Sequence, residues 1–308
     1  MSAEISIART QHAPYLSQEI ADNVRAHMDG DKEQIICIES PNITPSRRDW
    51  YENNFYPNIL DPSYNLTSRD RSMLAGNALA LATYMLRDTN PEVFCIDQDN
   101  SNLPETVRFQ EANKAIKANL PHMPNDQLLD VYTEATLARA DYIDLRDRVM
   151  AEQLADFALD PQFDGTQITA LVGAHHDGIA NYLEERGVTC NTFIASGKDF
   201  LGSMDANKTT TNPQRFMASD TLNHLAFPTP PQTAAEQFGR FSSANWTLSA
   251  YEDGPAFDQI VDDLGQMRVI AHEHPEFAPI AAHVTQSFMG RTAIQQITEF
   301  VSRQPVLL

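Results

Sequence analysis

The chain has 308 residues, of which 42% are hydrophobic and 21% are charged, and its formal net charge is −20. This length and apolar fraction allow a large buried core, in one large domain or in one domain with an appendage. The negative charge argues against nucleic acid and anionic membrane surfaces as partners, because their phosphates would repel the chain. No apolar run approaches the length of a membrane span, and the first residues lack the features of a secretory signal. We therefore expect a cytoplasmic protein.

The first elements form a strand–loop–helix–strand unit. Residues 5–8 alternate as in a short strand, and the polar loop that follows contains His12. A helix is expected from Ser17, a favourable N-cap residue, and residues 34–39 form a second apolar strand that ends in Glu39. This order of elements is typical of a parallel βαβ unit.

Residues 40–66 are rich in proline, asparagine and aromatic side chains and show no steady period. We interpret them as a long structured loop, which in compact domains is usually a lid or a binding loop. Packing of the aromatic side chains against the neighbouring helix is the alternative interpretation.

Three helices and one strand are expected in the middle of the chain. The helices are predicted at residues 68–87, 104–119 and 125–157, the last with room for one break, and the strand is predicted at 92–96. Pro104 suits the first turn of a helix. The strand ends in Asp97, and the long helical region contains Arg146.

A second strand–loop–helix–strand unit spans residues 168–194. Its apolar run over residues 168–172 is followed by a polar loop with His175 and His176, then by a helix and another strand. The unit repeats the order of the first, with His176 at the position of His12, and the repetition strengthens both assignments. Because ligands of open α/β sheets bind beyond the carboxyl ends of the strands, we expect these loops to line one cleft.

Together these patterns predict an α/β fold with a mixed, mostly parallel sheet that is flanked by helices and built from the two repeated units. We assign residues 1–196 to this domain. Residues 197–308 are expected to be a mainly helical appendage that packs on it, with helices at about 232–240, 256–274 and 277–302. We also expect these C-terminal helices to provide the contact of any homo-oligomer.

Four polar residues are expected at one edge of the sheet: His12, Glu39, Asp97 and His176. Glu39 and Asp97 each end a buried strand, where a charged side chain must be paired, bound to metal or open to a cleft. Two imidazoles and a carboxylate suit a divalent transition metal, which lowers the pKa of a bound water. A structural histidine is the ordinary interpretation of either residue alone, but their matching positions favour a functional site. His175 is expected to orient or pack beside it.

These motifs resemble those of the TraB/PrgY/Tiki-like proteins, a family related to erythromycin esterase and to ChaN-like folds. Residues 7–12 (IARTQH) and 172–179 (VGAHHDGI) are similar to its two GxxH motifs. Residues 93–99 (VFCIDQD) resemble its apolar strand that ends in IDRD, and residues 146–154 (RDRVMAEQL) resemble its helix that begins with arginine and an acid or amide. The resemblance covers residues 1 to about 196.

The chain departs from the family pattern at three points. Arg9 replaces the first glycine, Gln98 replaces the arginine of IDRD, and the second GxxH motif is one residue shorter than usual. A long side chain at position 9 either fills the metal pocket or binds an anionic group of the substrate.

The resemblance implies a cleft with both GxxH histidines and, in the Tiki branch, metal-dependent peptidase activity with manganese or cobalt. We therefore predict a metal-dependent hydrolase that acts on a peptide or small-molecule substrate and uses manganese, cobalt or zinc. His12 and His176 are the predicted metal ligands, Glu39 is predicted to be a ligand or the general base, and Asp97 is predicted to be a ligand or a supporting carboxylate. Arg146 is predicted to bind an oxyanion or a substrate carboxylate, or to pair with a carboxylate of the chain.

Two alternative functions are left open by the sequence. One is a non-catalytic protein of the same fold that binds or sequesters a peptide or small ligand, which Arg9 and Gln98 favour. The other is a metal-independent esterase in which a histidine is the general base.

Overall fold

The structure is a computed structural model, and it describes residues 3–11, 16–39, 50–61, 63, 78–97, 101–196, 211–231 and 234–290. The described residues divide into two compact units. The first contains those of residues 1–100 and 143–199, and the second contains those of residues 101–142 and 200–303.

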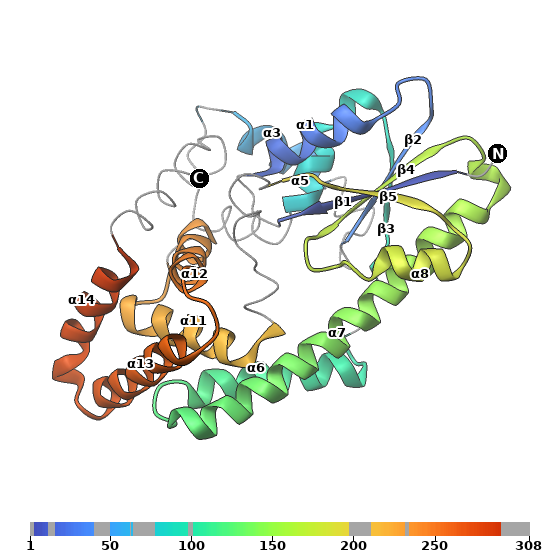
Figure 1. Cartoon of the computed structure of the whole chain (residues 1–308). Coiled ribbons are helices and arrows are strands. Elements are labelled where there is room, and N and C mark those ends of the chain that lie inside the picture. The colour runs from blue at the N-terminus through green and yellow to red at the C-terminus, as the bar shows by residue number, and fades with distance from the viewer. Residues whose placement is uncertain are drawn as a thin grey trace. The chain divides into compact units, whose positions relative to one another are not determined.

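The first unit is built on a five-stranded sheet in the order β3-β2-β4-β1-β5 (Figure 1). The strands are β1 (Glu4–Thr10), β2 (Gln34–Ile38), β3 (Glu92–Cys95), β4 (Gln167–Gly173) and β5 (Cys190–Ile194). Every pair of neighbouring strands is parallel. The predicted α/β fold with a mostly parallel sheet is therefore confirmed, and the described sheet is parallel throughout.

The two repeated units are interleaved. The chain passes from β1 through α1 (Ser17–His27) to β2, and from β4 through α8 (Ile179–Glu185) to β5. Because β1 and β4 are neighbours at the centre of the sheet, each connection steps over the other unit's first strand, and the two connections leave in opposite directions. The carboxyl ends of β1 and β4 therefore form a topological switch point, the usual place of a ligand site in such sheets.

Both faces of the central strands are covered, which explains why β2 and β4 are apolar without alternation. Every residue of β2 and of β4 is buried. Met150 and Leu154 of α7 (Asn125–Leu159) and Ile179 and Leu183 of α8 pack in one core with the strand residue Ile168. In Figure 1, α1 and α5 (Ala78–Met85) lie on the opposite side of the sheet from α8.

The aromatic segment that follows β2 in the chain contains helical turns. A π-helix over Tyr51–Phe55 continues into α3 (Tyr56–Ile59), so the prediction of a loop is wrong for these residues. Their rings pack on one another, and the ring of Tyr56 lies 5.1 Å from that of Tyr84 in α5. The interpretation as helix packing therefore holds for this part, because aromatic burial stabilises a segment that has no helical period.

The second unit is helical and has its own core. It contains α6 (Pro104–Asn119), the first part of α7, α11 (Pro213–Ala226), α12 (Ala234–Ser249), α13 (Pro255–Glu273) and α14 (Ala278–Met289). Apolar side chains of α6 and α7, such as Ile116 and Tyr132, share this core with Leu222 and Phe257. The predicted domain over residues 1–196 therefore differs from the first unit, because residues 101–142 belong with the C-terminal helices.

Helix α5 lies within the helix predicted at 68–87, of which residues 68–77 lie outside the described residues, and one described helix was missed. The helix expected at 104–119 is α6, and α7 runs unbroken for 35 residues to Leu159. Helix α11 was not predicted, because its polar start hides the apolar positions that follow. None of the helices in the described ranges combines the length and the apolarity that a bilayer crossing requires.

Helix α14 exposes a stripe of apolar side chains. Phe277, Ile280, Val284 and Phe288 are each more than one-third exposed and recur at helical spacing. The predicted homo-oligomer contact through the C-terminal helices would use this stripe, and it stays a prediction.

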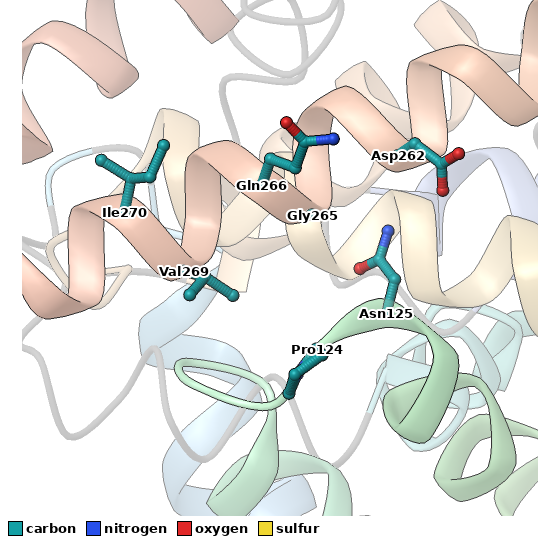
Figure 2. Close-up of a pocket in the computed structure, with 7 residues that line it drawn as sticks. All are labelled: Pro124, Asn125, Asp262, Gly265, Gln266, Val269 and Ile270. Atoms are coloured by element: carbon teal, nitrogen blue, oxygen red, sulfur yellow. The ribbon is translucent and has the colours of Figure 1, made fainter.

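A close approach of two helices in the second unit depends on Gly265 of α13. A pocket between α13 and the start of α7 is lined by both elements, and Figure 2 shows the Asn125 side chain pointing toward α13. Asn125 donates to the carbonyl of Val261 and accepts from the buried Arg268. A Cβ atom at position 265 would lie 2.1 Å from the Asn125 amide nitrogen.

Gly265→Ala should therefore destabilise the protein by about 1–3 kcal/mol, because Asn125 must give up hydrogen bonds to make room. Thermal unfolding measures the effect. Gly30→Ala is the matched control, since nothing lies within 4 Å of a Cβ atom there and its stability should be nearly unchanged. Equal melting temperatures for the two variants would contradict this packing.

Candidate functional site

Four of the predicted site residues meet at the carboxyl edge of the sheet. Glu39 follows β2, Asp97 follows β3, His176 follows β4, and Arg146 comes from α7. Arg146 Nη2 donates to Glu39 Oε1 and, at 2.6 Å, to Asp97 Oδ2. His12 lies outside the described residues.

Glu39 is held at the end of the sheet by backbone as well as by Arg146. Its Oε2 accepts the backbone N–H of Gly173 at 2.6 Å, which joins the ends of β2 and β4. A Cβ atom at position 173 would lie 2.7 Å from Cε1 of His175 and 3.2 Å from Glu39 Oε2. Glycine at this position is what lets a carboxylate and an imidazole approach the strand end.

His176 is fixed by Asp147, the acid of the motif at residues 146–154, to which the sequence analysis assigned no role. The Nδ1 atom of His176 is hydrogen-bonded to Asp147 Oδ1, and Asp147 Oδ2 accepts the backbone N–H of Gly178 at 2.9 Å. His176 and Asp147 are 1% and 2% exposed. The helical spacing could have predicted that Asp147 is buried. It lies three, four and seven residues before the core positions Met150, Ala151 and Leu154 and so begins the buried stripe of α7.

The other ring nitrogen of His176 faces the carboxylate of Glu39. Nε2 lies 3.1 Å from Glu39 Oε1, but not in hydrogen-bond geometry, and it has no hydrogen-bond partner among the described residues. Leaving a buried polar atom unpaired costs about 1–3 kcal/mol. An additional group bound between the two atoms would remove this cost.

Glu39, His175 and His176 together form a group that could hold a metal ion. Each offers one ligand atom, and these atoms all lie within 4.8 Å of one another. The rings of His175 and His176 are 4.1 Å apart, because the tight turn after Gly173 places both on one side. His175 was predicted as an orienting or packing neighbour, whereas the structure places it within ligand reach.

The formal charges of the cluster favour a bound cation. Arg146 pairs with the buried carboxylates of Glu39 and Asp97, and the His176 ring contacts those of Glu39 and Asp147, so three buried carboxylates share one guanidinium and one imidazole among the described residues. Burial alone lowers the pKa of His176, but its contacts with Asp147 and Glu39 outweigh burial and raise the pKa above the ordinary value. A proton on His176 and a divalent ion are therefore alternative ways to offset the negative charge.

Arg9 is hydrogen-bonded to the loop that carries both histidines. Its Nε and Nη2 both donate to the carbonyl of Ala174, the residue before His175. The side chain thereby fastens the loop that carries both histidines to the end of β1. Two roles were expected for Arg9: blocking the metal pocket or binding a substrate anion. The contact with Ala174 tests neither of them, and both stay predictions.

Comparison of the chain with protein-family models, with curated proteins and with solved structures gives no match. The resemblance to TraB/PrgY/Tiki-like proteins therefore stays a prediction.

Arg9→Ala should lower the melting temperature by about 2–4 °C, because the loop at Ala174 loses hydrogen bonds from a charged donor. It should also weaken binding of Zn²⁺ or Mn²⁺, measured by calorimetry, because the two imidazoles lose their common support. Arg186→Ala, which removes an exposed arginine paired with Glu152, is the control and should change neither quantity. Tighter ion binding in Arg9→Ala would show that Arg9 blocks the site.

Asp147→Asn should shift the pH dependence of ion binding. Ion binding needs an unprotonated Nε2, so in the wild type affinity should rise as pH increases through the raised pKa of His176. Without the Asp147 carboxylate that pKa falls, and affinity should reach its plateau at lower pH, with the plateau about 10–100-fold weaker because the ring loses its support.

Calorimetric titrations at several pH values between about 6 and 8 bracket the ordinary pKa of histidine and measure both changes. Asp144→Asn, at an exposed position one turn earlier in α7, is the control and should follow the wild-type profile. A variant profile that keeps the wild-type midpoint would contradict the coupling of Asp147 to His176.

Proposed function

We propose that this chain is a metal-dependent hydrolase whose ion is held by Glu39, His175 and His176. The observation that carries the proposal is the buried Nε2 of His176, which lacks a partner among the described residues and faces Glu39 Oε1. His12, the other ligand expected from the sequence, lies outside the described residues, and its part in the site is a separate prediction.

The donor set fits a divalent ion of intermediate softness. Two imidazole nitrogens and a carboxylate oxygen are suitable ligands for zinc, cobalt or manganese. Metal-binding histidines generally donate their second ring N–H to a carboxylate, and Asp147 occupies that position behind His176. The same carboxylate accepts the Gly178 N–H, so the tautomer that leaves Nε2 free to bind an ion is favoured.

A bound divalent ion would act as a Lewis acid and would lower the pKa of a water molecule bound to it toward neutral pH. The other groups of the site have roles that follow from their positions. Asp97 keeps one buried oxygen, Oδ1, without a partner among the described residues, and this atom can accept a proton or a hydrogen bond from water. Arg146 balances the charge of Glu39 and Asp97, which is the third of the roles predicted for it.

The substrate class follows from the resemblance and from charge. The resemblance to the Tiki branch favours a peptide or another small molecule with an amide or ester bond. The net charge of −20 disfavours nucleic acid as a substrate.

A metal-independent hydrolase is the second candidate, and a specific observation favours it. Arg146 already compensates Glu39 and Asp97 without an ion, and the Asp147–His176 pair has the arrangement of an oriented general base. In this case Nε2 of His176 would take a proton from the attacking water, and its raised pKa would suit that task.

Ion binding across ligand variants tests the proposal. Wild-type protein should bind one Zn²⁺, Co²⁺ or Mn²⁺, and His176→Ala should weaken binding by about 100-fold or more because the best-supported ligand is lost. Glu39→Gln and His175→Ala should weaken it by at least about 10-fold. His12→Ala tests the additional ligand. The measurements are calorimetry and metal content by mass spectrometry.

His283→Ala, which removes an exposed histidine of α14, is the control and should bind as the wild type does. Hydrolysis of aryl esters and fluorogenic peptides should be lost in a chelator and restored by the ion. Activity that persists in the chelator and disappears in His176→Ala would replace the metal-dependent proposal with the metal-independent one.

A further inference from the structure

We infer that Arg146 is a built-in competitor of the ion: it holds Glu39 Oε1 in the ion-free protein and must move onto Asp97 when the ion binds. This inference rests on the proposed function, because it concerns regulation of the same site. It assigns to Arg146 control of ion affinity rather than contact with the substrate.

The competition is for a single oxygen atom. Oε1 of Glu39 accepts from Arg146 Nη2 and is also the atom that lies 3.1 Å from His176 Nε2. The second oxygen, Oε2, is engaged by the Gly173 N–H. An ion that binds Oε1 of Glu39 together with Nε2 of His176 would share that oxygen with a guanidinium, and two cations repel each other strongly at such a distance in a buried site.

Asp97 provides the position to which Arg146 can move. The same nitrogen, Nη2, donates to Asp97 Oδ2 at 2.6 Å, so the guanidinium can leave Glu39 without leaving Asp97. Asp97 Oδ1 is buried and has no hydrogen-bond partner in the described parts of the chain. A shift of Arg146 toward Asp97 would let it donate to both oxygens, the favoured two-point pairing of arginine with a carboxylate.

The exchange keeps the charge of the cluster balanced in both states. Without the ion, Arg146 is shared by two carboxylates. With the ion, Glu39 is neutralised by the ion and Asp97 by Arg146. Each of these two buried carboxylates therefore has a cation beside it in both states. A buried carboxylate needs such a partner to stay ionised away from water.

Arg146→Gln is the first test. Removing the competitor should tighten binding of Zn²⁺ by about 10-fold or more, equivalent to about 1.4 kcal/mol or more. The melting temperature without ion should fall, because Glu39 and Asp97 lose their shared cation, and added Zn²⁺ should raise it more than in the wild type. Arg148→Gln is the matched control, since this exposed residue of the same helix pairs with Asp144 and should change nothing.

Asp97→Asn is the second test. It removes the position onto which Arg146 moves, so ion binding should weaken in the wild-type background. In the Arg146→Gln background the same substitution should have little effect, because the influence of Asp97 passes through Arg146. If Asp97 were itself a ligand of the ion, the two backgrounds would lose affinity equally.

The outcomes separate this inference from the proposed function. If neither wild type nor Arg146→Gln binds Zn²⁺, Co²⁺ or Mn²⁺ at millimolar concentration, the ion site itself is wrong. If both bind with the same affinity, or the variant binds more weakly, the site stands and the competition is wrong. Should Arg146→Gln fail to fold, Arg146→Lys decides: its ammonium can bridge Glu39 and Asp97 with one nitrogen but lacks the two-point fork that would hold it on Asp97, so ion binding should weaken, and unchanged or tighter binding would overturn the inference.

Discussion

Burial of carboxylates at the carboxyl edge of the sheet is the constraint on which the rest of the first unit depends. Glu39, Asp97 and Asp147 lie where water has little access, and an unpaired buried charge is too costly to keep. The chain meets this cost with a few specific contacts: the Gly173 and Gly178 amides, the Arg146 guanidinium and the His176 ring. Helix α7 must pass the sheet edge at Arg146 and Asp147, because both side chains complete this network.

The topology of the sheet explains why these residues meet. β1 and β4 form the centre, and the connections that leave them run to opposite sides of the sheet. The result is an edge at which the described segments after β2, β3 and β4 meet. Glu39 and Gly173 are 134 positions apart in the chain, yet they share one hydrogen bond there.

The helical unit follows a different logic. All the described residues of the candidate site belong to the first unit, whereas the second has its own apolar core. Arg268, which is fully buried, donates to the carbonyl oxygens of Leu120 and Met123, so it secures the turn between α6 and α7. This buried charge therefore supports the backbone, whereas the buried carboxylates of the first unit lie in the candidate site.

The sequence alone determined the strands of the sheet and the helices with an apolar period, though not the aromatic helical segment Tyr51–Ile59, because apolar periodicity is a local property. The strand of residues 168–172, the helix that begins at Ser17 and the strand-end positions of Glu39 and Asp97 were all readable in this way. These positions are enough to predict a polar site at the carboxyl edge of the sheet.

Only the tertiary structure decided which side chains touch. Asp147 stands beside Arg146 in a helix, where adjacent residues point in different directions, and its contact with His176 depends on where α7 crosses the sheet. The grouping of residues 101–142 with the C-terminal helices is likewise invisible in chain order, because α7 is long enough to serve two cores. Periodicity in the sequence predicts which face of a helix is buried. The element against which that face packs depends on contacts between segments far apart in the chain, and a local sequence pattern does not predict these contacts.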